Sequence, residues 1–385
     1  MRSMVLAANA APKVGGQGLN LHHMVEAYAP VFELSLFAKA AAEGAPTTIV
    51  PGSRLGGFIG RTPVLRRLRD WQGVLESSAF DQFVARNMPT ADIFQGAVGQ
   101  CSQSLSAARA KGAVTVLDVT TTHIDDFYEH QVRECAKFGV RTPHNERIRN
   151  QILDEYRKAD LIRVMSEHAR TTFLRRGFDP GRVFVMPPPI EAAEFPQAEF
   201  RESTFRVSFV GLIEPWKGFH YLIDAFRSLN LPDSELVLWG SSGARPIAEY
   251  LNRQMAALPS LKVRGGSVRS IGYGEVYGKS SVLVHPSLTD GFGYVVAEAM
   301  ASGIPVIVTR NTGAADAVID GYNGYIVEAG DASALAERIR HLALNRHLLT
   351  EMGAAARKTA LEMTIDRFRA PFLEHLKQRN VSCTT

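Results

Sequence analysis

The sequence predicts an α/β protein with two parallel, doubly wound sheets, one in each half of the chain. Its 385 residues exceed what one ordinary core accommodates and suit two domains of similar size. In both halves short apolar runs alternate with helical stretches, as in parallel sheets whose strands are connected by helices. A proline-rich segment at 183–190 lies between the halves. We expect ligands at the carboxyl ends of the strands, where doubly wound sheets bind them.

The first half contains short apolar runs that suit buried strands. They predict strands over 4–8, 47–50, 93–94 and 114–117. The stretches between them are longer and predict helices over 19–42 and 102–111.

The second half repeats this alternation. Its apolar runs predict strands over 206–210, 235–238, 262–264, 282–284 and 306–308. The segment 183–204 is the predicted linker between the two halves, because its prolines end regular structure and polar residues follow them.

Composition excludes several classes of protein. Hydrophobic residues make up 45% of the chain, as in ordinary globular proteins, and no apolar run is long enough to span a bilayer. The first residues predict a strand and loop rather than a signal peptide. Cys101, Cys135 and Cys383 lack metal-ligand spacing, which favours a reducing compartment and a cytoplasmic protein. The net charge of +4 is too small and dispersed to indicate a nucleic-acid partner.

The segment 282–308 carries the strongest functional signal. A strand is followed by Asp290, the loop 291–293 and a helix with Glu298 about two turns in, on the face bearing Tyr294 and Ala301. Free amides at a glycine-rich helix start suit phosphate or sugar oxygens, and carboxylates accept hydrogen bonds from sugar hydroxyls. Taken singly, each piece is ordinary, since a lone Glu is usually solvated and Gly-Phe-Gly is only a turn. Together they predict a nucleotide-sugar site.

This segment resembles the acidic-x7-Glu signature of retaining family 4 glycosyltransferases. The matching residues are Asp290, Gly291, Phe292, Gly293, Glu298, Ala299, Met300, Ala301, Gly303, Pro305 and Val306. The first acid of the signature is commonly Glu, and Asp here shortens its reach by one methylene. Further matches to the same family cover 209–218, 222–226, 312–313 and 320–324 in the second half and 160–177 in the first. The second half is the specific part of the resemblance, and the first half matches weakly.

The resemblance implies the GT-B fold, in which two Rossmann-like domains with parallel doubly wound sheets face a central cleft. Residues 1–190 would bind the acceptor, joined by a C-terminal helix over 365–385, and residues 200–364 would bind the donor. It implies a retaining glycosyltransferase that moves a sugar from a nucleotide-diphosphate sugar to a glycan, lipid-linked or small-molecule acceptor. Such a reaction belongs to polysaccharide or glycolipid biosynthesis.

The resemblance also assigns roles to residues. Glu298 would accept from the donor ribose, and Asp290 with the amides of 291–293 would hold the sugar, while backbone near 266–268 would recognise the base. The expected catalytic residues are Asp290, Lys217 and His123. The expected donor-binding residues are Gly16, Gly211, Arg245, Gly266, Ser267, Val268, Gly291, Phe292, Gly293 and Glu298.

One departure from the family concerns the charge on the donor diphosphate. The family usually has Arg directly after Gly211, where this chain has Leu212, although Lys217 is kept. Two cations stabilise a leaving diphosphate better than one. Either Arg245 or Arg264 substitutes, or catalysis is weak. No Asp-x-Asp metal motif follows a strand, so we predict no metal and no other cofactor.

Two features of the first half are less specific. The glycine-rich turn at 15–18 lacks the spacing of a dinucleotide site, and in the family such a loop contacts donor phosphates or the acceptor. We favour that role for Gly16 over a purely structural turn. His123 follows the strand at 114–117, where the family often has a His near the transferred sugar. Asp118 could occupy that place instead, and His22 and His23 are weaker candidates.

The stretch 54–69 has five arginines, no acid and interspersed apolar residues. Such a stretch suits an anionic membrane surface, so the protein could lie peripherally at the inner face of the membrane. A loop followed by a solvated basic helix explains it equally well. Two rival functions also remain: a nucleotide-sugar epimerase with the same architecture, and a non-catalytic nucleotide-sugar-binding paralogue, which Leu212 alone suggests.

Overall fold

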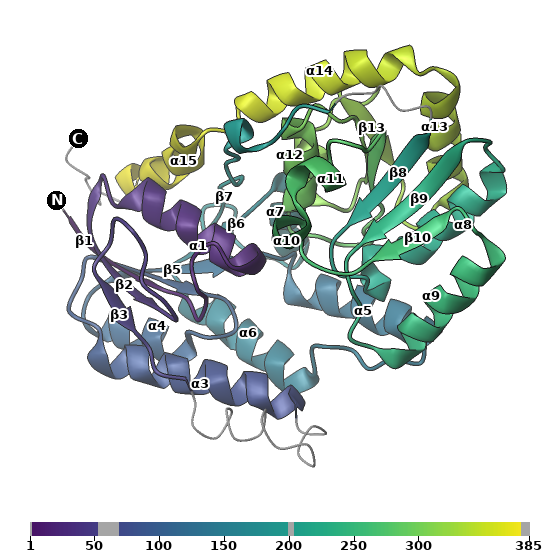
Figure 1. The fold of residues 1–385 in the computed structure, drawn as a ribbon. Coiled ribbons are helices and arrows are strands. Elements are labelled where there is room, and N and C mark those ends of the chain that lie inside the picture. Colours follow the sequence, from purple (N-terminus) through teal and green to yellow (C-terminus); the bar gives the residue numbers. More distant parts are fainter. Residues whose placement is uncertain (1, 53–68, 199–203, 379–385) are drawn as a thin grey trace.

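The computed structural model describes residues 2–52, 69–198 and 204–378 (Figure 1). Within these ranges the strands form a seven-stranded sheet of order β3-β2-β1-β4-β5-β6-β7 and a six-stranded sheet of order β10-β9-β8-β11-β12-β13. Neighbouring strands in both sheets run parallel. This confirms the predicted α/β class with two doubly wound domains.

The N-terminal domain contains the first sheet and its covering helices. Its elements are β1 (Arg2–Ala7), α1 (Gly15–Tyr28), β2 (Phe32–Ala38), β3 (Thr47–Ile49), α3 (Arg69–Asn87), β4 (Ile93–Ala97), α4 (Ser102–Ala110), β5 (Val114–Val119), α5 (Ile124–Lys137), α6 (Glu146–Lys158), β6 (Leu161–Val164), α7 (Glu167–Arg175) and β7 (Val183–Val185).

The helix predicted over 19–42 is wrong in its second half. The helix ends at Tyr28, shortly before Pro30, and β2 follows and pairs with β1. Proline has no N–H to donate inside a helix, so an end near this position is expected. The predicted linker over 183–204 also begins too early, because 183–185 form the edge strand β7.

The C-terminal domain follows a short 3-10 turn, η2 (Ala192–Glu194). Its elements are β8 (Phe205–Val210), η3 (Pro215–Lys217), α8 (Phe219–Leu229), β9 (Ser234–Trp239), α9 (Arg245–Ala257), β10 (Leu261–Arg264), α10 (Val268–Ile271), α11 (Tyr273–Val276), β11 (Val282–His285), α12 (Tyr294–Ala301), β12 (Val306–Thr309), η4 (Gly313–Ala317), β13 (Gly324–Val327), α13 (Ala332–Leu344) and α14 (His347–Leu361). One more helix, α15 (Ile365–Gln378), follows them.

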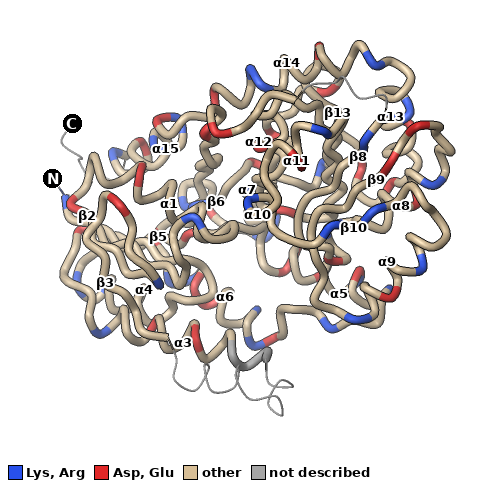
Figure 2. Tube along the Cα trace, in the orientation of Figure 1, with Lys and Arg blue, Asp and Glu red and all other residues tan. Residues whose placement is uncertain are grey.

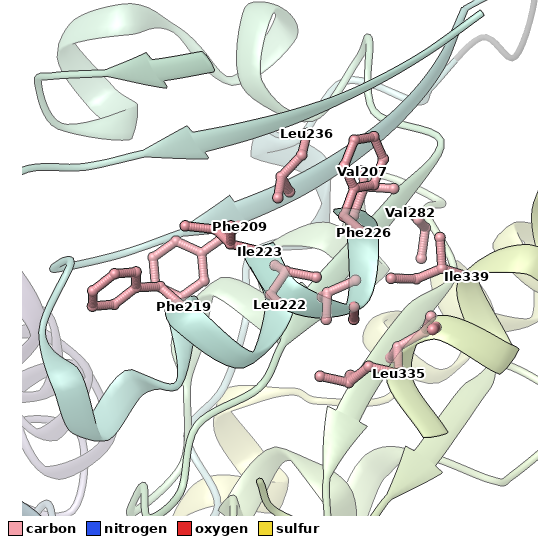
Figure 3. Close-up of a cluster of buried hydrophobic side chains, with 14 of the residues drawn as sticks. Val207, Phe209, Phe219, Leu222, Ile223, Phe226, Leu236, Val282, Leu335 and Ile339 are labelled. Atoms are coloured by element: carbon pink, nitrogen blue, oxygen red, sulfur yellow. The ribbon is translucent and has the colours of Figure 1, made fainter. Parts of the chain in front are cut away.

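The core of this domain lies between its sheet and the helices α8 and α13. Apolar side chains of β8, such as Val207 and Phe209, meet Leu222 of α8 and Leu335 of α13 (Figure 3). Burial of this apolar surface stabilises the domain and fixes β8 against β11, its neighbour in the sheet. The carboxyl ends of these two central strands therefore lie side by side.

The last helix returns to the N-terminal domain. Helix α15 lies beside α1 (Figure 1) and also contacts β7. Its side chains Phe368, Phe372 and Leu376 are fully buried in the N-terminal core. The Phe372 ring lies 5.0 Å from that of Tyr28. The chain thus crosses between the domains twice.

The two domains also contact each other through α5. Phe127 of α5 packs edge-on against Trp216 in η3, with ring centroids 6.3 Å apart. The buried carboxylate of Glu134 lies 3.2 Å from Nε2 of His220 in α8. Because η3 also carries Lys217, this interface links the N-terminal domain to the candidate site.

Charged residues are spread over both domains, with acids and bases interspersed (Figure 2). Among the described residues, no helix is long and apolar enough to cross a membrane, and no cluster of three potential metal ligands is found. Residues 54–68 of the arginine-rich stretch predicted to contact a membrane lie outside the described residues.

Candidate active site

Asp290 and Lys217 form the charged centre of the site. Lys217 lies in the turn after β8 and Asp290 in the loop after β11, so the pairing of these strands brings the two side chains together. Nζ of Lys217 lies 2.5 Å from Oδ2 of Asp290, and Nε2 of His285 lies 3.0 Å from the same oxygen. Burial alone would raise the pKa of Asp290, but Lys217 and His285 outweigh burial and hold this pKa well below its usual range.

The loop 291–293 is fixed against the N-terminal domain. A Cβ on Gly291 would lie 2.1 Å from the carbonyl oxygen of Thr120, so only glycine fits there. Ser166 Oγ donates to the carbonyl of Gly291 at 2.7 Å, and Phe292 is buried beside Met165. The N-terminal domain thus directly contacts the loop that follows Asp290.

Glu298 lies a little over one turn into α12, which begins at Tyr294, and not two turns in as predicted. Its Oε2 accepts a hydrogen bond from Tyr277 at 2.5 Å. Burial raises the pKa of Glu298 despite this hydrogen bond. Glu298 also lines a cavity.

That cavity has a volume of about 320 Å³ and lies between the domains. The N-terminal domain contributes Lys13, His22 and His23, and the connecting segment contributes Ile190, Glu191, Glu194 and Phe195; the C-terminal domain contributes Arg269, Tyr273 and Glu298. Nη1 of Arg269 donates to the carbonyl of Lys13 at 3.0 Å, which joins the two domains at the cavity. Within the described chain no carboxylate forms a salt bridge with Lys13 or with Arg269.

His23 is a buried base in the wall of this cavity. Burial lowers its pKa to about 3, with His22 and Arg269 acting in the same direction. Its Nδ1 has no hydrogen-bond partner among the described residues, and neither has the hydroxyl of Tyr294, whose ring lies 5.9 Å away. Leaving a buried polar group without a partner is costly, so these two groups are available to a ligand in the cavity.

The other predicted donor-binding residues occupy different places. Gly16 is exposed in the first turn of α1. Gly211 directly follows β8 and has φ +136°, and its carbonyl oxygen would lie 1.9 Å from a Cβ on Gly240. Gly266 has φ +115°, and Ser267 caps α10, the short helix that starts at Val268 and carries Arg269.

Arg245 is poorly placed to bind the donor diphosphate. Its side chain is 89% exposed at the start of α9 and pairs with Glu249 on the same helix. Arg264, the other substitute considered, is exposed on the edge strand β10. Neither lines the cavity beside Glu298, whereas Arg269 does.

His123 lies inside the N-terminal core. Its Nδ1 caps α5 by accepting from the backbone N–H of Asp125 at 3.2 Å, and its ring packs against Tyr156 and Phe173 at centroid distances of 5.0 and 4.9 Å. Burial lowers the pKa of His123 to about 4. The geometry favours a structural role, and contact with a transferred sugar stays a prediction.

Asp118, the alternative to His123, is also enclosed. Its carboxylate forms a buried ion pair with Arg163 at 2.7 Å and accepts from Asn20 in α1 at 2.6 Å. Both carboxylate oxygens are used within the N-terminal domain, so Asp118 has little capacity left for a ligand.

Sequence reasoning missed His285, Tyr277, Arg269 and Lys13. His285 stands at the carboxyl end of its strand and Arg269 directly follows the predicted base-binding segment, which were the available signals. Their partners, however, lie on other strands or in the other domain, and one sequence does not reveal such pairs.

Two Rossmann-like domains with a cavity between them, one carboxylate in the loop before α12 and another on that helix, are typical of the GT-B fold. Residues 191–359 match the family model described as glycosyl transferases group 1. The chain is 34% identical over 157 residues to the capsular polysaccharide biosynthesis glycosyltransferase CapM of Staphylococcus aureus, covering 40% of each chain. It is 29% identical over 242 residues to a D-inositol 3-phosphate glycosyltransferase of Geodermatophilus obscurus, covering 55% of this chain and 52% of that protein. These matches span about half or less of the curated relatives.

Solved structures match over nearly the whole chain. Anabaena Alr3699/HepE in complex with UDP-glucose superimposes with a TM-score of 0.70 at 17% identity, covering 98% of this chain and 100% of that one. Sucrose-phosphate synthase from Thermosynechococcus elongatus gives 0.74 at 19% identity, covering 99% and 100%. At such identities the likeness shows the fold, which is GT-B. The family match covers most of the C-terminal domain.

Proposed function

We propose that this chain is a retaining glycosyltransferase that moves a sugar from a nucleotide-diphosphate sugar to an acceptor. The observation that carries the proposal is the position of α12. Asp290 and Lys217 meet just before this helix, while Glu298 on the helix faces a cavity lined by both domains. One short segment thus serves both the reacting sugar and the nucleotide.

The roles follow from charge and reach. Lys217 stabilises the diphosphate as the bond to the sugar breaks, because negative charge grows there in the transition state. Asp290 accepts hydrogen bonds from sugar hydroxyls, aided by the amides of 291–293. Glu298 accepts from the ribose in the cavity. In this arrangement cations and amides replace a metal ion, and no other cofactor takes part.

We assign the cation missing at Leu212 to Arg269. The side chain of Leu212 is 63% exposed and carries no charge. Arg269 lies in the same cavity as Glu298, and its guanidinium is oriented by Lys13 and by the hydroxyl of Tyr273 at 3.3 Å. Glu191 and Glu194 also line the cavity, but both are exposed at the connecting segment, where water screens their charge.

The acceptor would be a glycan, a lipid-linked glycan or a small molecule, in polysaccharide or glycolipid biosynthesis. CapM, whose name places it in capsular polysaccharide biosynthesis, supports this range. We place the protein in the cytoplasm, held peripherally at the inner membrane face by the arginines of 54–69. Sedimentation with anionic vesicles at low and high salt tests this placement. Wild type that stays in the supernatant at low salt would favour a soluble acceptor.

A thermal-shift panel of UDP, GDP and ADP with their sugars tests the proposal, since a ligand that binds only the native state raises the melting temperature. We expect one nucleotide series to stabilise the protein. Incubation of the best donor without acceptor tests for an epimerase, and incubation with candidate acceptors tests for transfer. Interconversion of the sugar would indicate an epimerase. Binding without transfer to any acceptor would indicate the non-catalytic paralogue that the uncharged Leu212 suggests. No stabilisation by any member would contradict the proposal.

A further inference from the structure

The imidazole of His285 is buried at the end of β11, beside Asp290. Its Nε2 lies 3.0 Å from Oδ2 of Asp290. Its Nδ1 is buried without a hydrogen-bond partner in the described part of the chain. A proton on Nε2 therefore finds an acceptor, whereas one on Nδ1 would not. We infer that His285 is a positioning residue that donates to Asp290 and holds its carboxylate in place during transfer; this rests on the proposed function.

Asp290 needs a positioning residue because the oxygen that contacts His285 also contacts Lys217. Oδ2 of Asp290 contacts both Lys217 and His285. When a donor binds, its diphosphate competes for Lys217, which lies on a turn and is partly exposed. His285 is 3% exposed and cannot follow the diphosphate. Asp290 thus keeps one fixed partner at the moment when it loses the other.

The backbone of Asp290 is already fixed, so only its side chain needs positioning. Its N–H donates to the carbonyl of Asn311, and its carbonyl accepts from the N–H of Gly313, both at 3.1 Å. Rotation of the carboxylate remains free unless a second group holds it. Misplacement of a reacting group by about 1 Å can slow a reaction on the order of 100-fold.

Gly293 supports the same assignment independently. A Cβ at this position would lie 2.9 Å from Nε2 of His285, closer than real Cβ atoms approach. Its φ of +95° also favours glycine. The absence of a side chain at 293 therefore leaves the space in which the imidazole reaches Asp290.

The test compares three substitutions of His285 in the full chain, with kcat and KM for the best donor as readouts. Gln places an amide N–H near the position of Nε2, Asn is too short to do so, and Leu has no donor. We expect His285→Leu and His285→Asn to lower kcat about 10- to 100-fold with KM changed less than about threefold. His285→Gln should stay within about threefold of wild type.

Two controls separate positioning from stability. Val284→Ala removes buried apolar atoms from the neighbouring position of β11 and should lower the melting temperature without the loss in kcat. In an Asp290→Asn background, His285→Leu should cost little further activity if it acts through Asp290. Equal losses in the Gln and Leu variants, or none in the Leu variant, would overturn the inference. Absence of transfer by wild type would instead overturn the proposed function.

Discussion

Nζ of Lys217 and Oδ2 of Asp290 lie 2.5 Å apart, although Lys217 follows strand β8 and Asp290 follows strand β11. Parallel pairing of β8 with β11 makes this contact possible, because it aligns the ends from which both residues extend. The pair is the only predicted catalytic pair that the described structure brings together. It joins a cation suited to a diphosphate with a carboxylate suited to sugar hydroxyls.

Glu298→Ala should weaken binding of the preferred nucleoside diphosphate by roughly 1.5–3 kcal/mol, the range for a hydrogen bond to a charged group. The expected cause is loss of the acceptor for the ribose hydroxyls. Isothermal titration calorimetry measures the change. Glu328→Ala is the matched control, because Glu328 is exposed and pairs with Arg310 away from the cavity. A folded Glu298 variant with wild-type affinity would remove Glu298 from the site.

Lys217→Ala should reduce kcat more than it raises KM for the donor, because its charge is needed most as the diphosphate leaves. We expect a loss of about 10²- to 10³-fold, as for one electrostatic donor in an active site. Steady-state kinetics measure the two constants separately. Full turnover in this variant would show that the diphosphate is held elsewhere.

Arg269→Gln should weaken nucleoside diphosphate binding by roughly 1.5–3 kcal/mol while leaving binding of the corresponding nucleoside nearly unchanged. The reason is that a guanidinium forms its strongest hydrogen bonds with charged phosphate oxygens, which the nucleoside lacks. Arg245→Gln is the comparison, because Arg245 is exposed and paired with Glu249. Calorimetry with both ligands distinguishes phosphate contact from base contact. If only Arg245→Gln reduced the affinity, the assignment of the missing cation would pass to Arg245.

His123 should make stability depend on pH. Burial lowers the pKa of His123 from 6.5 to about 4, so the unfolded chain binds more protons between these values. Its contribution is therefore fully present above pH 6.5 and is lost as the pH falls toward 4. Between pH 8 and pH 5 this loss amounts to about 2 kcal/mol.

His123→Asn removes this titration while Asn still caps α5. Urea unfolding at pH 5 and pH 8 should show a smaller pH difference in the variant by about that amount. An unchanged difference would mean that His123 is protonated in the folded state, which would fit an open site better than a core.

The fold class could be predicted because both of its signals are local. Apolar runs such as 206–210 and 282–284 recur between helical stretches, and the structure has strands at these positions. The segment 32–38 was misread because short apolar stretches suit either a buried strand or a helix. Pairing with β1, which settles the matter, depends on residues far away in the chain.

The candidate site was predictable to the extent that its residues belong to sequence motifs. Asp290, Lys217 and Glu298 are motif residues, and the structure places them at the same end of one sheet or on its next helix. His285 and Arg269 act through contacts with Asp290 and with the other domain, which no spacing encodes. His123 follows the strand expected to precede a site histidine, but its burial depends on aromatic residues that are distant in the sequence.

The most direct measurement of the central claim is the configuration of the sugar after transfer. The best donor from the nucleotide panel is incubated with the protein and a simple alcohol in place of the natural acceptor, and the glycoside is examined by proton NMR. A glycoside cannot change its anomeric configuration in solution, so the product records the stereochemical course. The proposed function predicts a product with the anomeric configuration of the donor, formed together with the nucleoside diphosphate and strongly reduced in Lys217→Ala. A product of opposite configuration, or equal formation in the Lys217→Ala protein, would contradict it.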